Sequence, residues 1–181
     1  MNKTQHKILN AAFEVLAQDF SAPLEKIAET AGVTRATLHR YYHSREALME
    51  AASIELCRLT KAVIDEAAAS HDTPLQQLKA VVMKSAELGN RYHFLMHAME
   101  HDNQHDPKFQ KVEQQLADLI DAVRQAGYIR PDVPTPWIIH MYYGIMSASW
   151  RALKDGGVAP KQIPELAWQT FTSGLFMNGH Y

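Results

Sequence analysis

The sequence predicts an all-α fold in which a three-helix head is followed by a larger helical body, with about nine helices in total. Two observations predict this class. Apolar residues recur at three- and four-residue intervals through most of the 181 positions, and no run alternates as a half-buried strand would. Glycine, proline and helix-capping residues separate these runs. We expect the head to occupy residues 1–46 and the body residues 47–181.

Three helices are expected in the head. The apolar spacing predicts the first over residues 4–19. Pro23 fits the first turn of the second helix, because that position needs no backbone N–H, and Gly32 ends this helix. Thr34 can cap the third helix, which is short.

The body is expected to begin with a long helix. Ser44 can cap it, and it runs from Arg45 to about Ser70 before residues 71–74 break the chain. Further helices are expected over residues 75–89, 92–102, 107–127, 135–154 and 163–178. The longest apolar stretch, residues 137–150, is too short to span a bilayer.

The composition is that of a folded chain with a hydrophobic core, since 46% of the residues are hydrophobic and 21% are charged. The single cysteine, Cys57, excludes an internal disulfide framework and a cysteine-rich zinc module. No signal segment opens the sequence, so we expect a cytoplasmic protein. The phosphate-loop, Gly-x-Ser-x-Gly and His-Glu-x-x-His motifs are absent from the sequence, so we expect neither an enzyme nor a bound cofactor.

Charge is distributed unevenly between the two parts. Residues 1–45 carry six Lys and Arg against four Asp and Glu, whereas residues 46–181 carry twelve against sixteen. A mildly basic head on an acidic body suits a head that meets a polyanion. The imbalance is small enough to have arisen by chance.

The segment from Ile27 to Leu38 has the pattern of a helix-turn-helix. Ala28 is small enough for two helices to cross closely, and Gly32 stands where the turn needs a positive φ. The side chains expected in the shared core are Ile27, Ala31, Val33, Leu38 and Tyr42. Any helical hairpin with a glycine turn would share this local pattern.

The outward face of the third predicted helix contains no acidic residue. Its members are Thr34, Arg35, Ala36, Thr37, His39, Arg40 and Tyr41. A DNA major groove admits one helix, and an arginine fork can bind guanine O6 and N7 there. We expect Arg35 to reach base edges and Ala36 and Thr37 to meet thymine methyl groups. His39, Arg40 and Tyr41 can reach phosphates, as can Arg45 at the start of the next helix.

Three segments together resemble the DNA-binding head of the TetR/AcrR family of repressors. They are ILNAAF at residues 8–13, IAETAGVTRATLHRYY at 27–42 and SREAL at 44–48. The resemblance implies that Arg35, Ala36, Thr37 and His39 read or flank bases and that Thr34, Tyr41 and Arg45 hold phosphates. It also implies a homodimer, a palindromic operator, and a helical ligand-binding and dimerisation domain over residues 47–181.

The chain departs from the family pattern at several positions of the head. The family often has glycine at Ala36 and tyrosine at His39, so the base preference stays open. A hydroxyl residue usually starts the second helix, where this chain has Ala22-Pro23-Leu24. Ser21 is then the candidate for that phosphate contact.

The predicted helix over residues 135–154 is apolar on more than one side, which indicates that it is covered all round. A second copy of the chain is the natural cover, in a symmetric four-helix interface with the helix that follows. The residues expected in this dimer interface are Met141, Ile145, Ala148, Ala167, Phe171, Gly174 and Leu175. An ordinary monomer core is the alternative.

Methionine and aromatic residues are dense in the body, where they could line an adaptable apolar site for a small ligand. The candidates are Met83, Glu87, Arg91, Phe94, Met96, Met99, Trp137, Tyr142, Tyr143, Met146 and Trp150. For any one of them, core packing is the ordinary role.

Four histidines recur at four-residue intervals, and on a helix such a series could chelate a transition metal. They are His93, His97, His101 and His105. A solvated helix face is the alternative, and no cysteine lies nearby to complete a tight site.

Together these patterns predict a homodimeric DNA-binding transcriptional regulator, a repressor that a small, mainly apolar or aromatic ligand releases from a palindromic operator. The expected partners are double-stranded DNA, a second copy of the chain and the inducer. Two alternatives remain open. One is a helical ligand-binding or interaction protein without sequence-specific DNA binding, and the other is a metal-responsive repressor.

Overall fold

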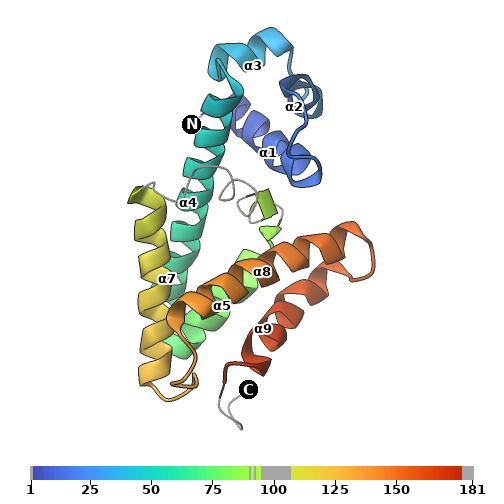
Figure 1. The fold of residues 1–181 in the computed structure, drawn as a ribbon. Helices are drawn as coiled ribbons and strands as arrows, with labels where there is room; N and C mark the ends of the chain where they lie inside the picture. The colour runs from blue at the N-terminus through green and yellow to red at the C-terminus, as the bar shows by residue number, and fades with distance from the viewer. Residues whose placement is uncertain (1, 90, 92, 95–106, 177–181) are drawn as a thin grey trace.

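The computed structural model describes residues 2–89, 91, 93–94 and 107–176. Their regular structure is helical, and the one β feature among them is an isolated bridge between Ile129 and Phe176. The all-α prediction is confirmed. A small head stands on a larger body, and one long helix runs through both (Figure 1).

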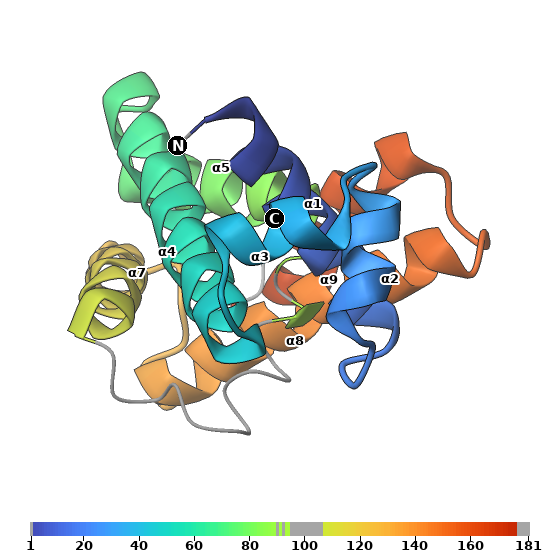
Figure 2. The ribbon, with the colours of Figure 1, turned by 90° about the horizontal axis from the view of Figure 1, so that it is seen from above.

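The head contains three helices, as predicted. They are α1 (Lys3–Gln18), α2 (Leu24–Thr30) and α3 (Arg35–Tyr41). In the view down onto the head, α3 lies between α2 and the first turns of the long helix (Figure 2). Figure 1 places α3 at the end of the molecule farthest from the body.

The body is built from five α-helices and one short 3₁₀ helix within the described residues. They are α4 (Arg45–Ser70), α5 (Pro74–Ala86), α7 (Pro107–Gln125), α8 (Thr135–Lys154), η1 (Pro160–Gln162) and α9 (Ile163–Ser173). The ends of α4 and α8 agree with the sequence prediction. The helix expected over 92–102 lies mostly outside the described residues. Of the described helices, none combines the length and apolar character needed to cross a membrane.

Two predicted helix caps are confirmed. The Thr34 hydroxyl accepts a hydrogen bond from the Thr37 N–H at 3.1 Å, and Ser44 accepts one from the Ala47 N–H at 3.2 Å. Each cap satisfies an N–H that the first turn of a helix leaves without a partner. Pro23 is the residue before α2 rather than its first residue. The cap residues therefore fix where α3 and α4 begin.

Gly32 forms the corner between α2 and α3. Its φ is +64°, in the left-handed region that glycine adopts without steric cost. The Gly32 N–H donates to the Glu29 carbonyl, and the Val33 N–H donates to the Ala28 carbonyl, each at 3.0 Å. This pair of bonds is the Schellman ending of a helix, and it turns the chain directly into α3. The positive φ predicted from the sequence is confirmed.

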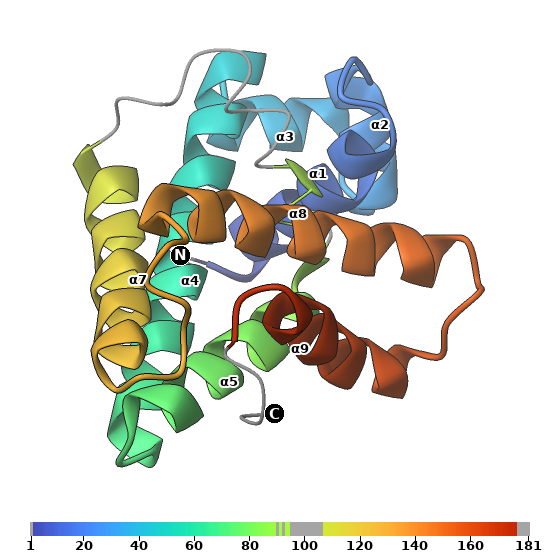
Figure 3. The same ribbon diagram turned by 60° about the horizontal axis from the view of Figure 1, so that its bottom comes forward.

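The long helix α4 belongs to both parts of the molecule. Leu48 and Ala52 are fully buried near its head end, and Val63 and Ala67 are buried near its other end. In the body α4 packs against α5 and α7, and α8 and α9 run side by side (Figure 3). The expected boundary after residue 46 falls in the first turn of α4. The head and body are thus joined by a continuous helix rather than by a linker.

Gly89, just after α5, makes a close approach to α8. A Cβ placed on Gly89 would lie 2.9 Å from the Trp150 Cβ and 3.0 Å from the Met146 carbonyl oxygen. These distances are too short for any side chain, so a glycine is required where the chain passes α8.

Arg45 ties the start of α4 to the loop between α1 and α2. Its guanidinium donates to the Ala22 carbonyl at 2.5 Å and to the Phe20 carbonyl, and it lies 5.9 Å from the centre of the Phe20 ring. These carbonyls belong to the loop between α1 and α2, which also has its own hydrogen bonds from Ser21 and Ala22 to Asp19. The sequence predicted a phosphate contact for Arg45, and the structure adds a role inside the head that local pattern could not reveal.

We expect Arg45→Ala to lower the free energy of unfolding by about 2 kcal/mol, because it removes charged hydrogen bonds to two loop carbonyls. Urea denaturation followed by circular dichroism measures this change. Arg40→Ala is the control, since Arg40 is exposed and its guanidinium lies over the Tyr41 ring at 5.3 Å. Equal stability of the two variants would contradict the role of Arg45.

Candidate nucleic-acid interface and body sites

The outer face of α3 is exposed as the sequence predicted. Leu38 points inward and is fully buried, and Tyr42, directly after the helix, is buried too. The exposed residues of the face are Thr34, Arg35, Ala36 and Arg40, and the half-buried ones are Thr37, His39 and Tyr41. The face thus presents hydrogen-bond donors and small side chains on a helix that stands clear of the body (Figure 1).

Arg35 is the first residue of α3, and its side chain reaches back across the head. Its Nε lies 3.0 Å from Oε1 of Glu25 on α2 and 3.5 Å from Nε2 of His39 one turn along α3. The three side chains therefore form a small cluster on the exposed side of the turn. The acid-free character of α3 does not extend to its neighbour α2.

Tyr41 joins the end of α3 to the beginning of α1. The Asn2 side-chain amide donates to the Tyr41 hydroxyl at 3.3 Å, and this hydrogen bond, with Arg40 nearby, lowers the pKa of Tyr41. Asn2 also caps α1, because its side chain accepts the Gln5 N–H at 2.9 Å. The start of α1 and the end of α3 therefore lie at one edge of the exposed face.

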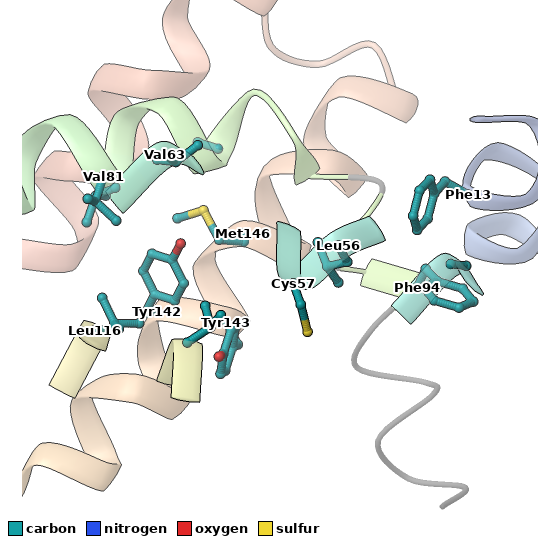
Figure 4. Close-up of a cluster of buried hydrophobic side chains, with 14 of the residues drawn as sticks. Phe13, Leu56, Cys57, Val63, Val81, Phe94, Leu116, Tyr142, Tyr143 and Met146 are labelled. Carbon is teal, nitrogen blue, oxygen red and sulfur yellow. The ribbon is translucent and has the colours of Figure 1, made fainter. Parts of the chain in front are cut away.

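Phe94 packs against the head of the molecule. Its ring meets Phe13 of α1 edge-on, with centroids 5.4 Å apart, and lies 6.1 Å from the Phe20 ring (Figure 4). Arg91 reinforces this contact, since it donates to the Asn10 side-chain oxygen at 3.0 Å and lies over the Phe13 ring. Burial lowers the pKa of Arg91, and the charge of Glu55 opposes this shift. Sequence spacing gave no signal for these contacts across the chain.

Aromatic and polar side chains meet where α5, α7 and α8 pack in the body (Figure 4). The Tyr142 hydroxyl donates to the Ser85 hydroxyl at 2.7 Å, and both residues are fully buried. Tyr143 packs against Tyr142 and Phe109, with ring centroids 5.3 and 6.3 Å apart. The structure therefore brings together three of the predicted ligand-site residues: Tyr142, Tyr143 and Met146.

Trp150 of α8 has an aromatic partner outside this cluster. The His93 ring stacks on it with centroids 4.5 Å apart, and His93 Nδ1 lies 2.6 Å from the Ser147 hydroxyl. His93 is buried, so it is part of the packing between the segment after α5 and α8.

Other predicted ligand-site residues lie elsewhere. Met83 and Glu87 line a groove of about 430 Å³ between α4, α5 and the start of α9. Trp137 is 62% exposed in the single chain and is not among the residues that line this groove. Its exposure follows from its position on α8, because Ile138, Tyr142 and Met146 form the buried face and Trp137 points the other way. Met96 and Met99 lie outside the described residues.

The predicted dimer residues fall into two groups. Ala167, Phe171 and Leu175 are buried within the single chain, so their side chains form its own core and do not present a surface to a partner. Met141, Ile145, Ala148 and Gly174 are exposed or half-buried. Two large apolar residues are exposed beside them, Trp137 at 62% and Leu166 at 44%. Periodicity identified apolar positions on α8 and α9 but could not say which of them the chain covers by itself.

The histidine series is only partly placed. His93 is engaged by Ser147 and Trp150, as above, whereas His97, His101 and His105 lie outside the described residues. Among the residues that the structure describes, no three His, Cys, Asp or Glu side chains are grouped so that they could hold a metal ion.

The head matches a known family model. Residues 8–52 match the model described as bacterial regulatory proteins, tetR family. Over 175 residues the chain is 31% identical to the HTH-type transcriptional repressor LfrR of Mycolicibacterium smegmatis. The aligned region covers 96% of this chain and 90% of that protein.

Solved structures have the same fold over nearly the whole chain. A crystal structure of LfrR from Mycobacterium smegmatis in complex with proflavine superposes with a TM-score of 0.75, at 29% identity, over 96% of this chain and 97% of that one. The ketosteroid regulator KstR2 of Mycobacterium tuberculosis gives a TM-score of 0.72 at 19% identity, over 98% and 97% of the two chains, and this supports the fold alone. With its helix-turn-helix head and this identity along its length, the chain belongs to the TetR family of DNA-binding transcriptional repressors, which are regulators and not enzymes.

Proposed function

We propose that two copies of the chain bind a palindromic operator, with one α3 in each of two successive major grooves, and that a small apolar or aromatic ligand releases them. The observation that carries the DNA part is the exposed outer face of α3, which has no acidic residue and begins with Arg35. In helix-turn-helix dimers the two recognition helices lie about 34–36 Å apart, one turn of the DNA helix.

The contacts divide by type. Arg35, Ala36, Thr37 and His39 lie on the part of α3 proposed to read or flank bases. The residues proposed to contact phosphates are Thr34, Arg40, Tyr41 and Arg45. Arg45 keeps only part of its donors for this purpose, because two loop carbonyls already bind its guanidinium.

In-vitro selection of bound DNA, followed by titration at several salt concentrations, tests this proposal. Wild-type chain should select a palindrome. Arg35→Ala should weaken operator binding by about 1–3 kcal/mol and relax the preference at one base pair in each half-site. Arg35→Lys keeps the charge but lacks the fork that binds guanine, so it should lose the same preference while keeping its salt dependence. Unchanged affinity and selectivity of Arg35→Ala would show that Arg35 does not read bases.

A partner copy is proposed to cover the outward faces of α8 and α9. On α8 this face contains Trp137, Met141, Gly144 and Ala148, whose three- and four-residue spacing puts them on one side of the helix. A Cβ on Gly144 would meet nothing within 4 Å in the single chain, so its small size serves no packing inside the protomer. An exposed apolar face with room for close approach suits an isologous helix bundle.

Ala148→Glu should convert the dimer to a monomer, since symmetry would bury two carboxylates at the interface and each costs several kcal/mol without a partner. Sedimentation equilibrium measures the association constant. Ala62→Glu makes the same change at an exposed position of α4 and should leave the association unchanged. If both variants sediment as wild type does, this face is not the interface.

The proposal that a small ligand releases the DNA is supported by the aromatic cluster of the body and by the similarity to LfrR. The related LfrR has been crystallised with proflavine, a planar aromatic molecule. In this chain Tyr142, Tyr143 and Phe109 place aromatic rings together, and the Tyr142 and Ser85 hydroxyls supply a polar pair among them. An apolar site with a few polar groups is what small aromatic ligands require.

Proflavine should weaken operator binding by about 5- to 150-fold, the range that a coupling of about 1–3 kcal/mol produces. Its binding is followed by its fluorescence and its effect on DNA by an electrophoretic shift. Tyr142→Phe removes the buried hydroxyl and should weaken proflavine binding about fivefold. Tyr128→Phe removes a hydroxyl beyond the end of α7 and should bind as wild type does. Equal proflavine affinities of these two variants would place the ligand elsewhere.

A further inference from the structure

One ion pair links the two helices of the helix-turn-helix. Glu25 lies in the first turn of α2, and its Oε1 is 3.0 Å from the Nε of Arg35 on α3. The side chains are 49% and 67% exposed, so the pair lies on the surface that is proposed to face DNA. The other ion pair described within the head, Lys26 with Glu29, joins residues of α2 alone.

The ion pair leaves the two terminal nitrogens of the Arg35 guanidinium available. Oε1 of Glu25 forms an ion pair with the Nε side of the guanidinium at 3.0 Å, and the Nε–H donates its hydrogen bond to His39 Nε2 at 3.5 Å. Among the described residues, no hydrogen bond is made by the two terminal nitrogens of Arg35. Guanine O6 and N7 accept two parallel N–H bonds from one edge of a guanidinium, and the terminal nitrogens supply such an edge.

We propose that Glu25 is a positioning residue that raises the sequence selectivity of Arg35, an inference that rests on the proposed DNA-binding function. The carboxylate of Glu25 attracts the Nε side of the guanidinium and His39 accepts the Nε–H, so the terminal nitrogens of this exposed side chain are left for a base. The first turn of a helix is a favourable place for a carboxylate, which helps to keep Glu25 in this position.

The charge of Glu25 acts differently on the two kinds of DNA complex. On non-specific DNA the protein is held by phosphates, so a carboxylate on the binding face repels the backbone and competes with it for Arg35. On the operator the guanidinium can bind guanine while Glu25 still holds Nε. Glu25 therefore lowers non-specific affinity more than operator affinity.

The test compares Glu25→Gln with Glu29→Gln in the full-length chain. The first keeps the size and shape of the side chain without its charge, and the second makes the same charge change at an exposed residue of the same helix. Affinities are measured for the selected operator and for a scrambled duplex of equal length. Glu25→Gln should lower the ratio of the two affinities by a factor of about two to five, the size of effect that an exposed ion pair carries. Glu29→Gln should leave this ratio unchanged.

Two further variants separate positioning from bulk charge. Glu25→Ala removes the carboxylate together with the rest of the side chain, and in-vitro selection should then relax base preference only at the base pair that Arg35→Ala affects. In an Arg35→Ala background, Glu25→Gln should no longer change the affinity ratio, since the two residues act through one contact.

Four results would be decisive against this role. If Glu25→Gln and Glu29→Gln changed the affinity ratio equally, the effect of Glu25 would be that of any negative charge on the head. A ratio that falls with Glu25→Gln even without Arg35 would show that Arg35 is not the group positioned. If the wild-type chain selects no DNA sequence, the proposed function is wrong and the role of Glu25 is wrong with it. If the chain selects a palindrome but Glu25→Gln leaves the affinity ratio unchanged, only the role of Glu25 is wrong.

Discussion

The outer face of α3, which is proposed to bind DNA, exists because Leu38 and Tyr42 hold a helix that could not form by itself. The helix α3 has seven residues, and isolated helices shorter than about 12–15 residues are unstable in water. Burying such side chains contributes to stability and so offsets part of the conformational entropy lost when the short helix is ordered. The Gly32 corner lets α3 turn back onto α2 so that this burial is possible. The exposed residues of α3 therefore depend on the side chains that face inward.

Packing of buried side chains also connects the head to the body. Phe94 packs against Phe13 and Phe20 of the head, while His93, its neighbour in sequence, stacks on Trp150 of α8. Arg91 adds a hydrogen bond to Asn10 of α1. A short segment thus contacts the head on one side and α8 on the other. Any ligand that displaces it on the α8 side must also disturb the packing against α1.

Local pattern predicted the features of the fold that depend on neighbouring residues. The caps Thr34 and Ser44 and the positive φ of Gly32 are set within a few positions of chain, and all three are as expected. The features that were missed join distant residues. Arg45 binds carbonyls of the α1–α2 loop, more than twenty residues earlier, and Phe94 packs against α1. Hydrophobic periodicity carries no information about such pairings.

In the body, too, the apolar pattern of the sequence could not predict which side chains the chain buries. Both Trp137 and Phe171 are large, apolar and helical, and the sequence made the first a pocket candidate from the density of aromatic residues and the second an interface candidate from its apolar helix. The structure exposes Trp137 and buries Phe171 in the protomer, because each helix has two apolar sides and only packing decides which one the chain covers. The candidate DNA contacts were easier to predict, since a short helix with one buried side leaves its other side exposed. Glu25 was missed because it reaches this face from another helix.

The length of α4 explains how small changes in the body could act on DNA. Its 26 residues extend about 39 Å at 1.5 Å per residue, from the body packing against α5 and α7 to the turn that follows α3. A tilt of roughly 5° about the body end would move the head end by roughly 3 Å over this length. Hydrogen bonds to base edges tolerate only a few tenths of an ångström in distance. A dimer that holds two such helices by the α8–α9 faces would need only a few degrees of change to take both recognition helices out of register.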